Sequence, residues 1–372
     1  MDTKIYRGLN NVLSLKDDWQ RLEAIAVDVS YFSTFRYVTD WWSAYASDSS
    51  VEPYIVVAIV DSKIVGIAPL QIKTYKTRLS DYKELQFAHG GGDHANLLIN
   101  HCEEVDPSKI VNELIKVILD NENDYDRISL THIGHMSLLA HQLLISRQNQ
   151  ALTYLVECPF INFSKYSTYD EFTKVFLPKK IKQYINRFGR EVNYSMRVTN
   201  ENLVDEFAKI HIAEKNYLKD KGFAHRHSFF ENEREISFRK QLYNDNSNVL
   251  TYMLVDNSND EIICYYTGYV FNNKFHSVTT AYHPKYASLA VGKIFNYMIF
   301  EENFKNPQWE IFDMGTGRYA WKFEMTDTFT LLYKLNINMF RTSWSWFCYR
   351  CNEIVSSLFH AFHDLKRNER LS

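Results

Sequence analysis

The second half of the chain shows the clearest alternation of hydrophobic and polar positions. Runs rich in aromatic and β-branched residues, separated by short polar turns, predict three antiparallel strands at residues 248–255, 261–271 and 274–281. Apolar residues at helical spacing predict helices before and after these strands, at residues 204–218, 229–243 and 291–304. A last apolar run at 309–314 predicts one more strand, which leads into a loop with Gly315 and Gly317.

The first half repeats this order in a weaker form. Helical patterns within residues 14–46 precede a predicted hairpin at 54–75, and a predicted helix at 107–119 precedes a strand at 127–130. A chain of 372 residues is longer than a single core usually supports. We therefore predict an α/β fold (α+β mixed) with two tandem domains, each a central mixed sheet flanked by helices. The expected segments are 1–158, 159–341, which enters through a linker at 159–176, and an amphipathic tail at 342–372.

Composition and charge narrow the class of protein. A hydrophobic content of 45% supplies a sizeable core, and a formal net charge of -3 gives no reason to expect nucleic-acid binding. The sequence shows neither a secretory signal nor a run long and apolar enough to span a membrane. The 5 cysteines are scattered, and Cys348 and Cys351 lack the second pair that a zinc site needs, so no metal is expected. These features predict a cytoplasmic protein.

The stretch 282–323 contains the strongest candidate for a binding site. A predicted strand ends near Tyr282, a turn through Pro284 follows, and the next helix begins near Ala290 with Gly292 in its first turn. A helix start has free backbone N–H groups and a partial positive charge, and a glycine there allows a phosphate to approach the backbone. Many helix starts contain a glycine and bind no ligand, so this pattern alone leaves both interpretations open.

Two segments in this stretch carry a resemblance to a known family. The first reads Tyr286-Ala287-Ser288-Leu289-Ala290-Val291-Gly292, and the second reads Asp313-Met314-Gly315-Thr316-Gly317-Arg318-Tyr319-Ala320-Trp321-Lys322. They resemble segments of the GNAT acetyltransferases, and more narrowly of the branch associated with cellulose and exopolysaccharide biosynthesis. That branch has Ser-Pro where this chain has Ala290-Val291, and Tyr where it has Trp321. The resemblance implies two tandem GNAT-like domains, an arrangement that Fem-type peptidyltransferases share.

The resemblance also implies a reaction and a cosubstrate. The protein would be an N-acyltransferase that moves an acyl group from acetyl-CoA or another acyl-CoA to an amine. The implied acceptor is an amino sugar, a sugar nucleotide or a polysaccharide precursor. The pyrophosphate would bind to the backbone at Ala290, Val291, Gly292 and Lys293, with the side chain of Lys285 or Lys293 assisting.

Catalysis further requires a group that takes a proton from the amine and one that protonates the departing thiolate. In the implied site, Asp313 would accept the proton or orient the acceptor, and capping of the glycine loop is its alternative role. Lys322 would pair with Asp313 or with a phosphate of the donor. The candidate thiolate acids are Tyr282 and Tyr319, and the candidate bases are His276 and His283.

Two other functions stay open from the sequence. A Fem-like enzyme would take an aminoacyl group from transfer RNA and would have no affinity for coenzyme A. A noncatalytic accessory protein would bind a polysaccharide-synthesis complex and would tolerate replacement of Gly292 and Asp313.

Three further features have both structural and functional interpretations. The glycine run at 89–93 is either a bulged strand edge or turn, or a substrate-facing loop. The basic helix predicted at 179–191 either presents a solvated face or attracts an anionic acyl carrier, sugar nucleotide or polysaccharide. The apolar stripe of 342–365 packs on the domain, binds a partner complex, or lies on the surface of the inner membrane.

Overall fold

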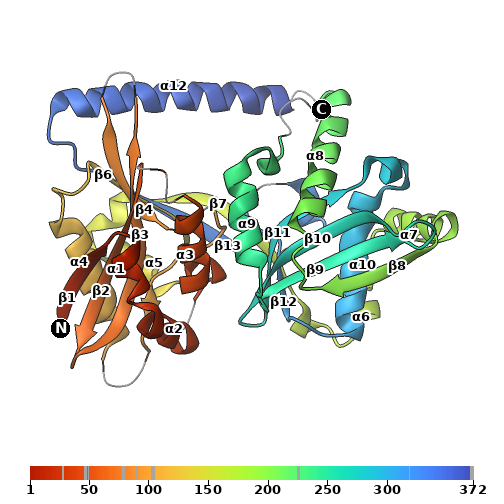
Figure 1. Ribbon diagram of the computed structural model, residues 1–372, viewed down its shortest axis with the longest axis horizontal. Helices are drawn as coiled ribbons and strands as arrows, with labels where there is room; N and C mark the ends of the chain where they lie inside the picture. Colours follow the sequence, from red (N-terminus) through yellow and green to blue (C-terminus); the bar gives the residue numbers. More distant parts are fainter. Residues whose placement is uncertain are drawn as a thin grey trace. The chain divides into compact units, whose positions relative to one another are not determined.

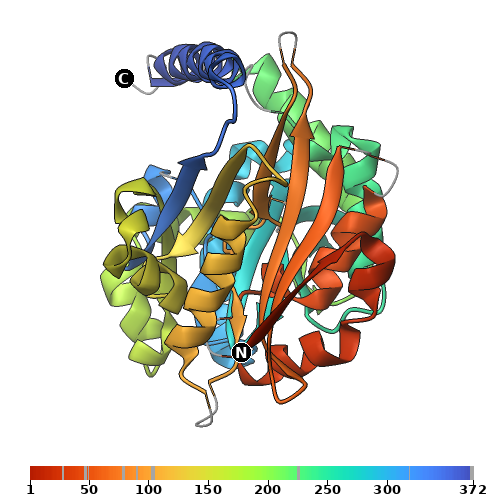
Figure 2. The same cartoon turned by 90° about the vertical axis from the view of Figure 1, so that its left-hand side faces the viewer.

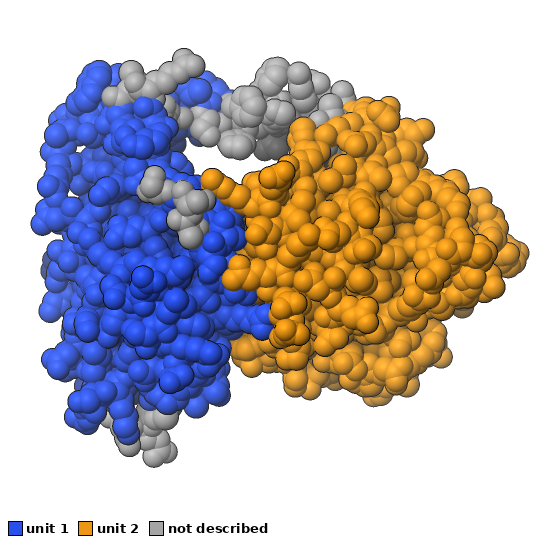
Figure 3. All heavy atoms as spheres, in the orientation of Figure 1, with its two compact units in different colours: residues 1–155, 332–372 blue, residues 156–331 orange. Residues whose placement is uncertain are grey.

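Figure 1 shows the computed structural model, which describes residues 1–26, 29–45, 48, 50–77, 80–88, 91–101, 105–223, 227–317 and 319–368. In the last helix it describes the side chains up to Leu358, except those of Asn352 and Ser356. Of the positions discussed above, residues 89 and 90 of the glycine run, one of the five cysteines (Cys102), Arg318 and residues 369–372 of the tail lie outside the described residues. The chain divides into two compact units, which Figure 3 colours separately: unit 1 comprises 1–155 and 332–372, and unit 2 comprises 156–331.

The chain passes between the units inside two strands. It leaves unit 1 within β7 (Leu152–Asn162) and returns within β13 (Phe329–Asn338). Residues 159–176 are therefore not a linker, because they contain the end of β7, the 3-10 turn η3 (Phe163–Lys165) and helix α6 (Tyr169–Phe176). The polar run Ser164-Lys165-Tyr166-Ser167-Thr168 made this segment resemble a linker. Within the strand, the carbonyl of Pro159 accepts the amide of Met314 at 3.0 Å, a bond that does not need the N–H that proline lacks.

Unit 2 contains a mixed sheet with the order β7-β12-β11-β10-β9-β8. Its further strands are β8 (Tyr194–Thr199), β9 (Val249–Asp256), β10 (Glu261–Phe271), β11 (Lys274–Tyr282) and β12 (Ile311–Asp313). The predicted antiparallel meander is confirmed as β9, β10 and β11. The short strand β12 pairs in parallel with β11 and antiparallel with β7.

Helices cover both faces of the unit 2 sheet because successive side chains of β10 point to opposite sides. Tyr265 stacks on Phe207 of α8 (Val204–Asp220) with a centroid distance of 4.2 Å, and α9 (Glu233–Tyr243) packs beside α8. Tyr266 belongs instead to an aromatic cluster with Phe275 and Phe312. On that side the sheet is covered by α10 (Val291–Lys305), α6 and α7 (Lys179–Glu191).

Unit 1 repeats this topology with the sheet order β1-β2-β3-β4-β6-β13. Its strands are β1 (Asp2–Arg7), β2 (Val51–Val60), β3 (Lys63–Tyr75), β4 (Tyr82–Phe87), the short β5 (Leu98–Ile99) beside β3, and β6 (Arg127–Gly134). Its helices before the tail are α1 (Leu9–Leu13), α2 (Lys16–Ile25), α3 (Phe35–Ala44), α4 (Pro107–Asp120) and α5 (Leu138–Ile145). As in unit 2, three antiparallel strands are followed by a helix and a strand in parallel pairing, here β4 with β6. The predicted repeat of two mixed sheets flanked by helices is confirmed.

Two glycines of unit 1 allow close packing. Helix α4 packs across β2 and β3 (Figure 2). A Cβ atom on Gly66 of β3 would stand 2.4 Å from Cγ2 of Ile110 on α4. A Cβ atom on Gly92 would stand 2.4 Å from the ring of Phe32, and Gly91 has a φ of +83°. These two members of the glycine run are therefore explained by packing and backbone conformation.

The C-terminal helix α12 (Ser343–Asn368) starts on unit 1. Tyr349 stacks on Phe340 with a centroid distance of 5.1 Å, and the guanidinium of Arg127 lies 4.8 Å from the Tyr349 ring. Neither α12 nor any other helix within the described ranges combines the length and hydrophobicity needed to cross a bilayer.

Candidate active site

The site begins where strand β11 turns into helix α10. A 3-10 turn, η5 (Pro284–Leu289), connects them, and Ala290 then adopts a left-handed conformation with φ 57° and ψ 30°. This conformation is unfavourable for a residue with a Cβ atom and is therefore typical of functional segments. No side chain caps the helix start, and Gly292 and Lys293 are exposed. The amides of Val291 and Gly292 have no acceptor among the described residues and are thus available to an anion, whereas the amides of Ala290 and Lys293 donate to the carbonyl oxygens of Ala287 and Ala290 at 3.3 and 2.8 Å.

The end of β11 packs against this helix start. A Cβ atom on Gly292 would stand 3.3 Å from Cδ1 and Cε1 of Tyr282, so the Tyr282 ring lies next to the Gly292 backbone. Burial raises the pKa of Tyr282 to about 12, and the nearby negative charge of Glu214 on α8 adds to the effect. The Tyr282 hydroxyl is therefore protonated at neutral pH and can donate a hydrogen bond.

Two carboxylates at the β9–β10 turn anchor η5. Tyr286 donates to Oδ2 of Asp256 at 2.8 Å, and Nζ of Lys285 donates to Oε2 of Glu261 at 2.9 Å. Nε2 of His283 lies 3.4 Å from Oε1 of the same Glu261. The hydrogen bond from Lys285 is the main reason that the pKa of Glu261 is lowered. Lys285 and His283 thus hold the loop in place, whereas Lys293 has no carboxylate partner among the described residues.

Strand β11 is paired along only part of its length on the side of β12. The parallel ladder joins Lys274–His276 to Ile311–Asp313, where β12 ends, while β11 continues to Tyr282. Within the described ranges, the second half of β11 therefore has no ladder partner on this side. Its free N–H and C=O groups can bind an extended ligand in the way a sheet edge binds a strand. The ladder to β10 is irregular at Gly268, where a Cβ atom would stand 2.3 Å from the His276 carbonyl oxygen.

Asp313 caps the glycine loop that follows β12. Its Oδ1 accepts the amide of Gly315 at 2.9 Å and the thiol of Cys158 at 3.1 Å. Nδ1 of His276 lies 3.9 Å from Oδ2, and both side chains are buried. Of the roles that the sequence suggested for Asp313, loop capping is thus directly visible.

Lys322 holds the same loop from the other end. The side chain is buried, and Nζ donates to the carbonyl oxygens of Gly315 and Thr316, both at 2.8 Å. The Tyr319 ring covers Gly317, which has a φ of +113°, and Nζ of Lys322 lies 5.5 Å from the centre of that ring. Asp313 and Lys322 therefore both hold the Gly315–Thr316 part of this loop through hydrogen bonds.

Comparison with known families identifies this part of the chain. Residues 177–323 match the acetyltransferase (GNAT) domain family. Residues 177–323 form a GNAT acetyltransferase domain. This domain lies within unit 2 and includes the α10 helix start, the open half of β11 and the glycine loop. The protein is therefore an acyltransferase.

Solved structures align with most of this chain, and the first two below share its fold. FemX aligns with a TM-score of 0.60 at 8% identity, over 91% of this chain and 98% of its own. A conserved protein of unknown function from Bacteroides thetaiotaomicron aligns with a TM-score of 0.51 at 13% identity, over 86% of this chain and 96% of its own. A tandem GNAT protein from the clavulanic acid biosynthesis pathway aligns with a TM-score of 0.48 at 9% identity, over 92% and 100% of the two chains. The search of curated protein sequences gave no match.

The GNAT domain places the predicted site residues in three groups. Tyr282 meets Ala290, Val291 and Gly292 at the helix start, with Lys293 exposed beside them. Asp313, Tyr319 and Lys322 form the loop after β12, and His276 lies beside Asp313. Lys285 and His283 are bound to Glu261. The first two groups lie at opposite ends of the open half of β11, ~20 Å apart at the usual rise of a strand.

The sequence interpretation missed Glu214 of the GNAT domain. This carboxylate is buried on α8, lies 2.5 Å from Nζ of Lys215, and acts on the pKa of Tyr282. One helical turn before it, His211 is also buried, and its Nδ1 lies 2.7 Å from Oγ of Ser228. Both residues lie on the buried face of α8 with Phe207 and Ile210. Polar residues on an otherwise apolar helical face are the signal that would have found them.

Proposed function

We propose that the protein is an acyl-CoA-dependent N-acyltransferase that transfers an acyl group, most simply acetyl, to an amine. The observation that carries this proposal is the uncapped, exposed start of α10 at the end of a strand that is open along one side. The helix start suits the diphosphate of coenzyme A, and the open strand edge suits the amide groups of its extended arm. The ~20 Å between the helix start and Asp313 is the distance along β11 that such an arm would follow.

In this proposal the helix-start group binds the donor. The amides of Val291 and Gly292 bind the diphosphate, and the ammonium of Lys293 assists. The Tyr282 hydroxyl donates to the same end of the donor, because its ring lies against Gly292. Lys285 and His283 contribute indirectly, by holding η5 on Glu261.

The chemical step then takes place near the other end of β11. The amine nitrogen attacks the thioester carbonyl carbon, the carbon–sulfur bond breaks, the nitrogen loses a proton, and the departing thiolate gains one. Asp313, with His276 beside it, receives the proton of the amine or orients the acceptor. Tyr319 supplies the proton to the thiolate, because it belongs to the loop at this end. Lys322 fixes the loop through its two carbonyl contacts.

The acceptor in this proposal is an amine on an amino sugar, a sugar nucleotide or a polysaccharide precursor. The two segments that resemble the exopolysaccharide branch, residues 286–292 and 313–322, support this class. They are also the segments that form the helix start and the glycine loop.

We place the enzyme on the cytoplasmic side, with α12 as a contact to a membrane surface or a synthesis complex. This helix exposes a row of large apolar side chains: Trp344 by 60%, Phe347 by 51%, Ile354 by 52%, Val355 by 67% and Leu358 by 66%. A contiguous row of exposed apolar side chains is typical of a surface that binds a protein partner or a membrane.

A second candidate function is Fem-like transfer of an aminoacyl group from transfer RNA. The five basic residues of α7 are the feature that favours it, because an RNA donor requires cationic contacts. The fold, which FemX shares, is compatible with both functions.

Two donor assays separate these functions. The first follows thiol release from acetyl-CoA with glucosamine, a glucosamine nucleotide and a simple alkylamine as acceptors. The second follows the loss of aminoacyl groups from aminoacyl-tRNA with the same acceptors. The proposal predicts amine-dependent thiol release and no consumption of aminoacyl-tRNA. Consumption of aminoacyl-tRNA alone would replace it with the Fem-like function, and inactivity with both donors would favour an accessory role.

A further inference from the structure

Helix α7 carries an unbalanced positive charge on its exposed side. Its basic residues are Lys179, Lys180, Lys182, Arg187 and Arg190, and its acidic residue is Glu191. Nε of Arg187 pairs with Oε1 of Glu191 at 2.6 Å. Within the described part of the chain, the other four cations have no carboxylate within ion-pair distance. An anionic ligand would complete the charge balance of this surface.

The apolar side of α7 packs onto the segment that forms the donor site. Ile181, Tyr184, Ile185 and Phe188 belong to the same hydrophobic cluster as Tyr286, Val291 and Ile294, and α7 packs directly against η5 and α10. The strand that follows α7 is tied to the same loop: Tyr194 pairs with Asp256 across the sheet, and Asp256 accepts the Tyr286 hydroxyl. The charged side of α7 is therefore fixed beside the turn that leads into α10.

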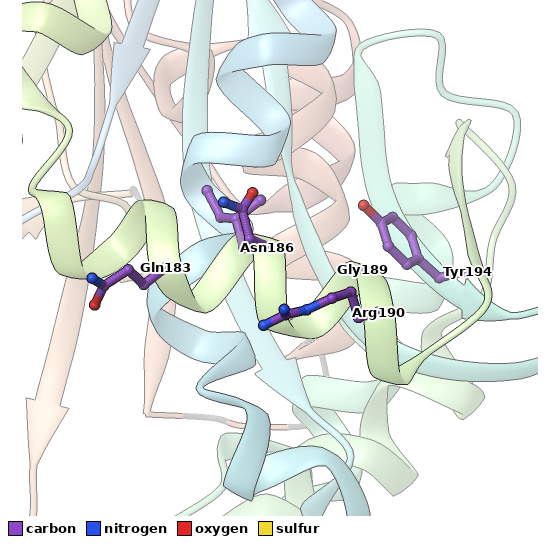
Figure 4. Close-up of a pocket in the computed structure, with 6 residues that line it drawn as sticks. Gln183, Asn186, Gly189, Arg190 and Tyr194 are labelled. Atoms are coloured by element: carbon purple, nitrogen blue, oxygen red, sulfur yellow. The ribbon is translucent and has the colours of Figure 1, made fainter.

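A hollow of about 630 Å³ lies on this helix (Figure 4). It is lined by Gln183, Ile185, Asn186, Gly189, Arg190 and Tyr194. A Cβ atom on Gly189 would meet no atom within 4 Å, so the backbone forms an open floor there. The carboxamides of Gln183 and Asn186 can donate and accept hydrogen bonds, and the ring of Tyr194 can stack on a base. The guanidinium of Arg190 can donate two hydrogen bonds to a phosphate. No carboxylate lines the hollow, and Glu301 of α10, whose charge acts on the pKa of Tyr194, is paired with Lys305 at 2.7 Å.

From this arrangement we infer that α7 binds the phosphorylated adenosine end of the acyl donor. The purine stacks on Tyr194 and contacts the carboxamides of Gln183 and Asn186, while Arg190 binds the 3′-phosphate. This inference rests on the proposed use of acyl-CoA and adds a specific consequence. The enzyme should discriminate coenzyme A thioesters from their 3′-dephospho forms.

Calorimetric titration of the full chain with acetyl-CoA and with 3′-dephospho-acetyl-CoA tests the inference. We expect the wild type to bind acetyl-CoA about tenfold more tightly, the effect of one charge-assisted contact. Arg190→Gln should remove this difference and leave the affinity for the dephospho compound unchanged. Lys209→Gln, an exposed change on α8, is the matched control and should retain the difference.

Filling the hollow gives a second, independent test. Gly189→Phe has open space for its side chain and should weaken binding of both thioesters about tenfold, whereas the control Lys209→Gln should leave both affinities unchanged. Circular dichroism melting curves check that each variant is folded. Equal affinities of the wild type for the two thioesters, or a Gly189→Phe variant that binds both normally, would overturn the inference and leave the proposed function intact. Failure of the wild type to bind either thioester would reject both.

Discussion

The ring of Tyr282 lies against the backbone of Gly292. If residue 292 had a Cβ atom, that atom would stand 3.3 Å from each of two carbons of the ring, Cδ1 and Cε1. This relationship joins the last residue of β11 to the first turn of α10. A Cβ atom on residue 292 would press the ring aside by a few tenths of an ångström. Glycine therefore leaves room for the Tyr282 ring as well as for access to the helix amides.

The position of Tyr282 predicts a role in donor binding. Tyr282→Phe should raise the KM for acetyl-CoA about tenfold and leave kcat unchanged, because only a hydrogen bond to the bound donor is lost. Tyr319→Phe should lower kcat about 100-fold at unchanged KM, the usual effect of removing a general acid. Steady-state kinetics of both variants test this division. The reverse pattern, a fall in kcat for Tyr282→Phe alone, would assign the acid role to Tyr282.

The buried ammonium of Lys322 predicts a large contribution to stability. Lys322→Met leaves the carbonyls of Gly315 and Thr316 without their donor and should lower the free energy of unfolding by about 2–3 kcal/mol. Urea unfolding at pH 7 measures this loss. Lys305→Met removes only an exposed pair with Glu301 and should change stability by less than about 0.5 kcal/mol. Equal effects of the two substitutions would show that the loop does not depend on Lys322.

The burial of His211 predicts that the free energy of unfolding falls at acid pH. Burial lowers the pKa of His211 to about 3, with smaller effects from Lys215 and Arg239, so this side chain is neutral in the folded protein. In the unfolded chain it takes up a proton near pH 6.5. The neutral His211 thus makes its full contribution to the free energy of unfolding above pH 6.5, and this contribution is lost as the pH falls towards 3. Between pH 6.5 and 5 the loss amounts to about 2 kcal/mol. His211→Gln should remove this part of the pH dependence in urea titrations at pH 7 and 5. An unchanged pH profile would indicate that His211 is solvated.

Much of the fold follows from the periodicity of the sequence. The meander β9–β11 and the helices α8 and α10 have long periodic patterns bounded by polar turns, and all were predicted. Strand β8 was missed, because Arg197 pairs with Asp260 at its exposed edge and the run reads as polar. Strand β7 was missed, because its last residues fell within the segment 159–176, which its polar residues made resemble a linker.

The details of the site were less accessible from sequence. The helix start and its glycine could be predicted, since they depend on local order along the chain. The partners of Lys285 and Lys322 could not. Lys285 meets Glu261 only after β10 and β11 pair, and Lys322 is buried although lysine side chains are seldom fully buried. Local patterns do not specify such tertiary contacts.

The most direct test of the account is calorimetric titration of the wild type and Gly292→Asp with acetyl-CoA, with the exposed α8 variant Lys209→Gln as the control. The negative charge of an aspartate in the first turn interacts favourably with the helix dipole, so the variant should fold. Its carboxylate, however, competes with the diphosphate for the same amides. We predict a wild-type Kd below about 1 mM, binding at least about tenfold weaker in Gly292→Asp, and normal binding in the control. No binding by the wild type at millimolar acetyl-CoA, or undiminished binding by Gly292→Asp, would contradict the account.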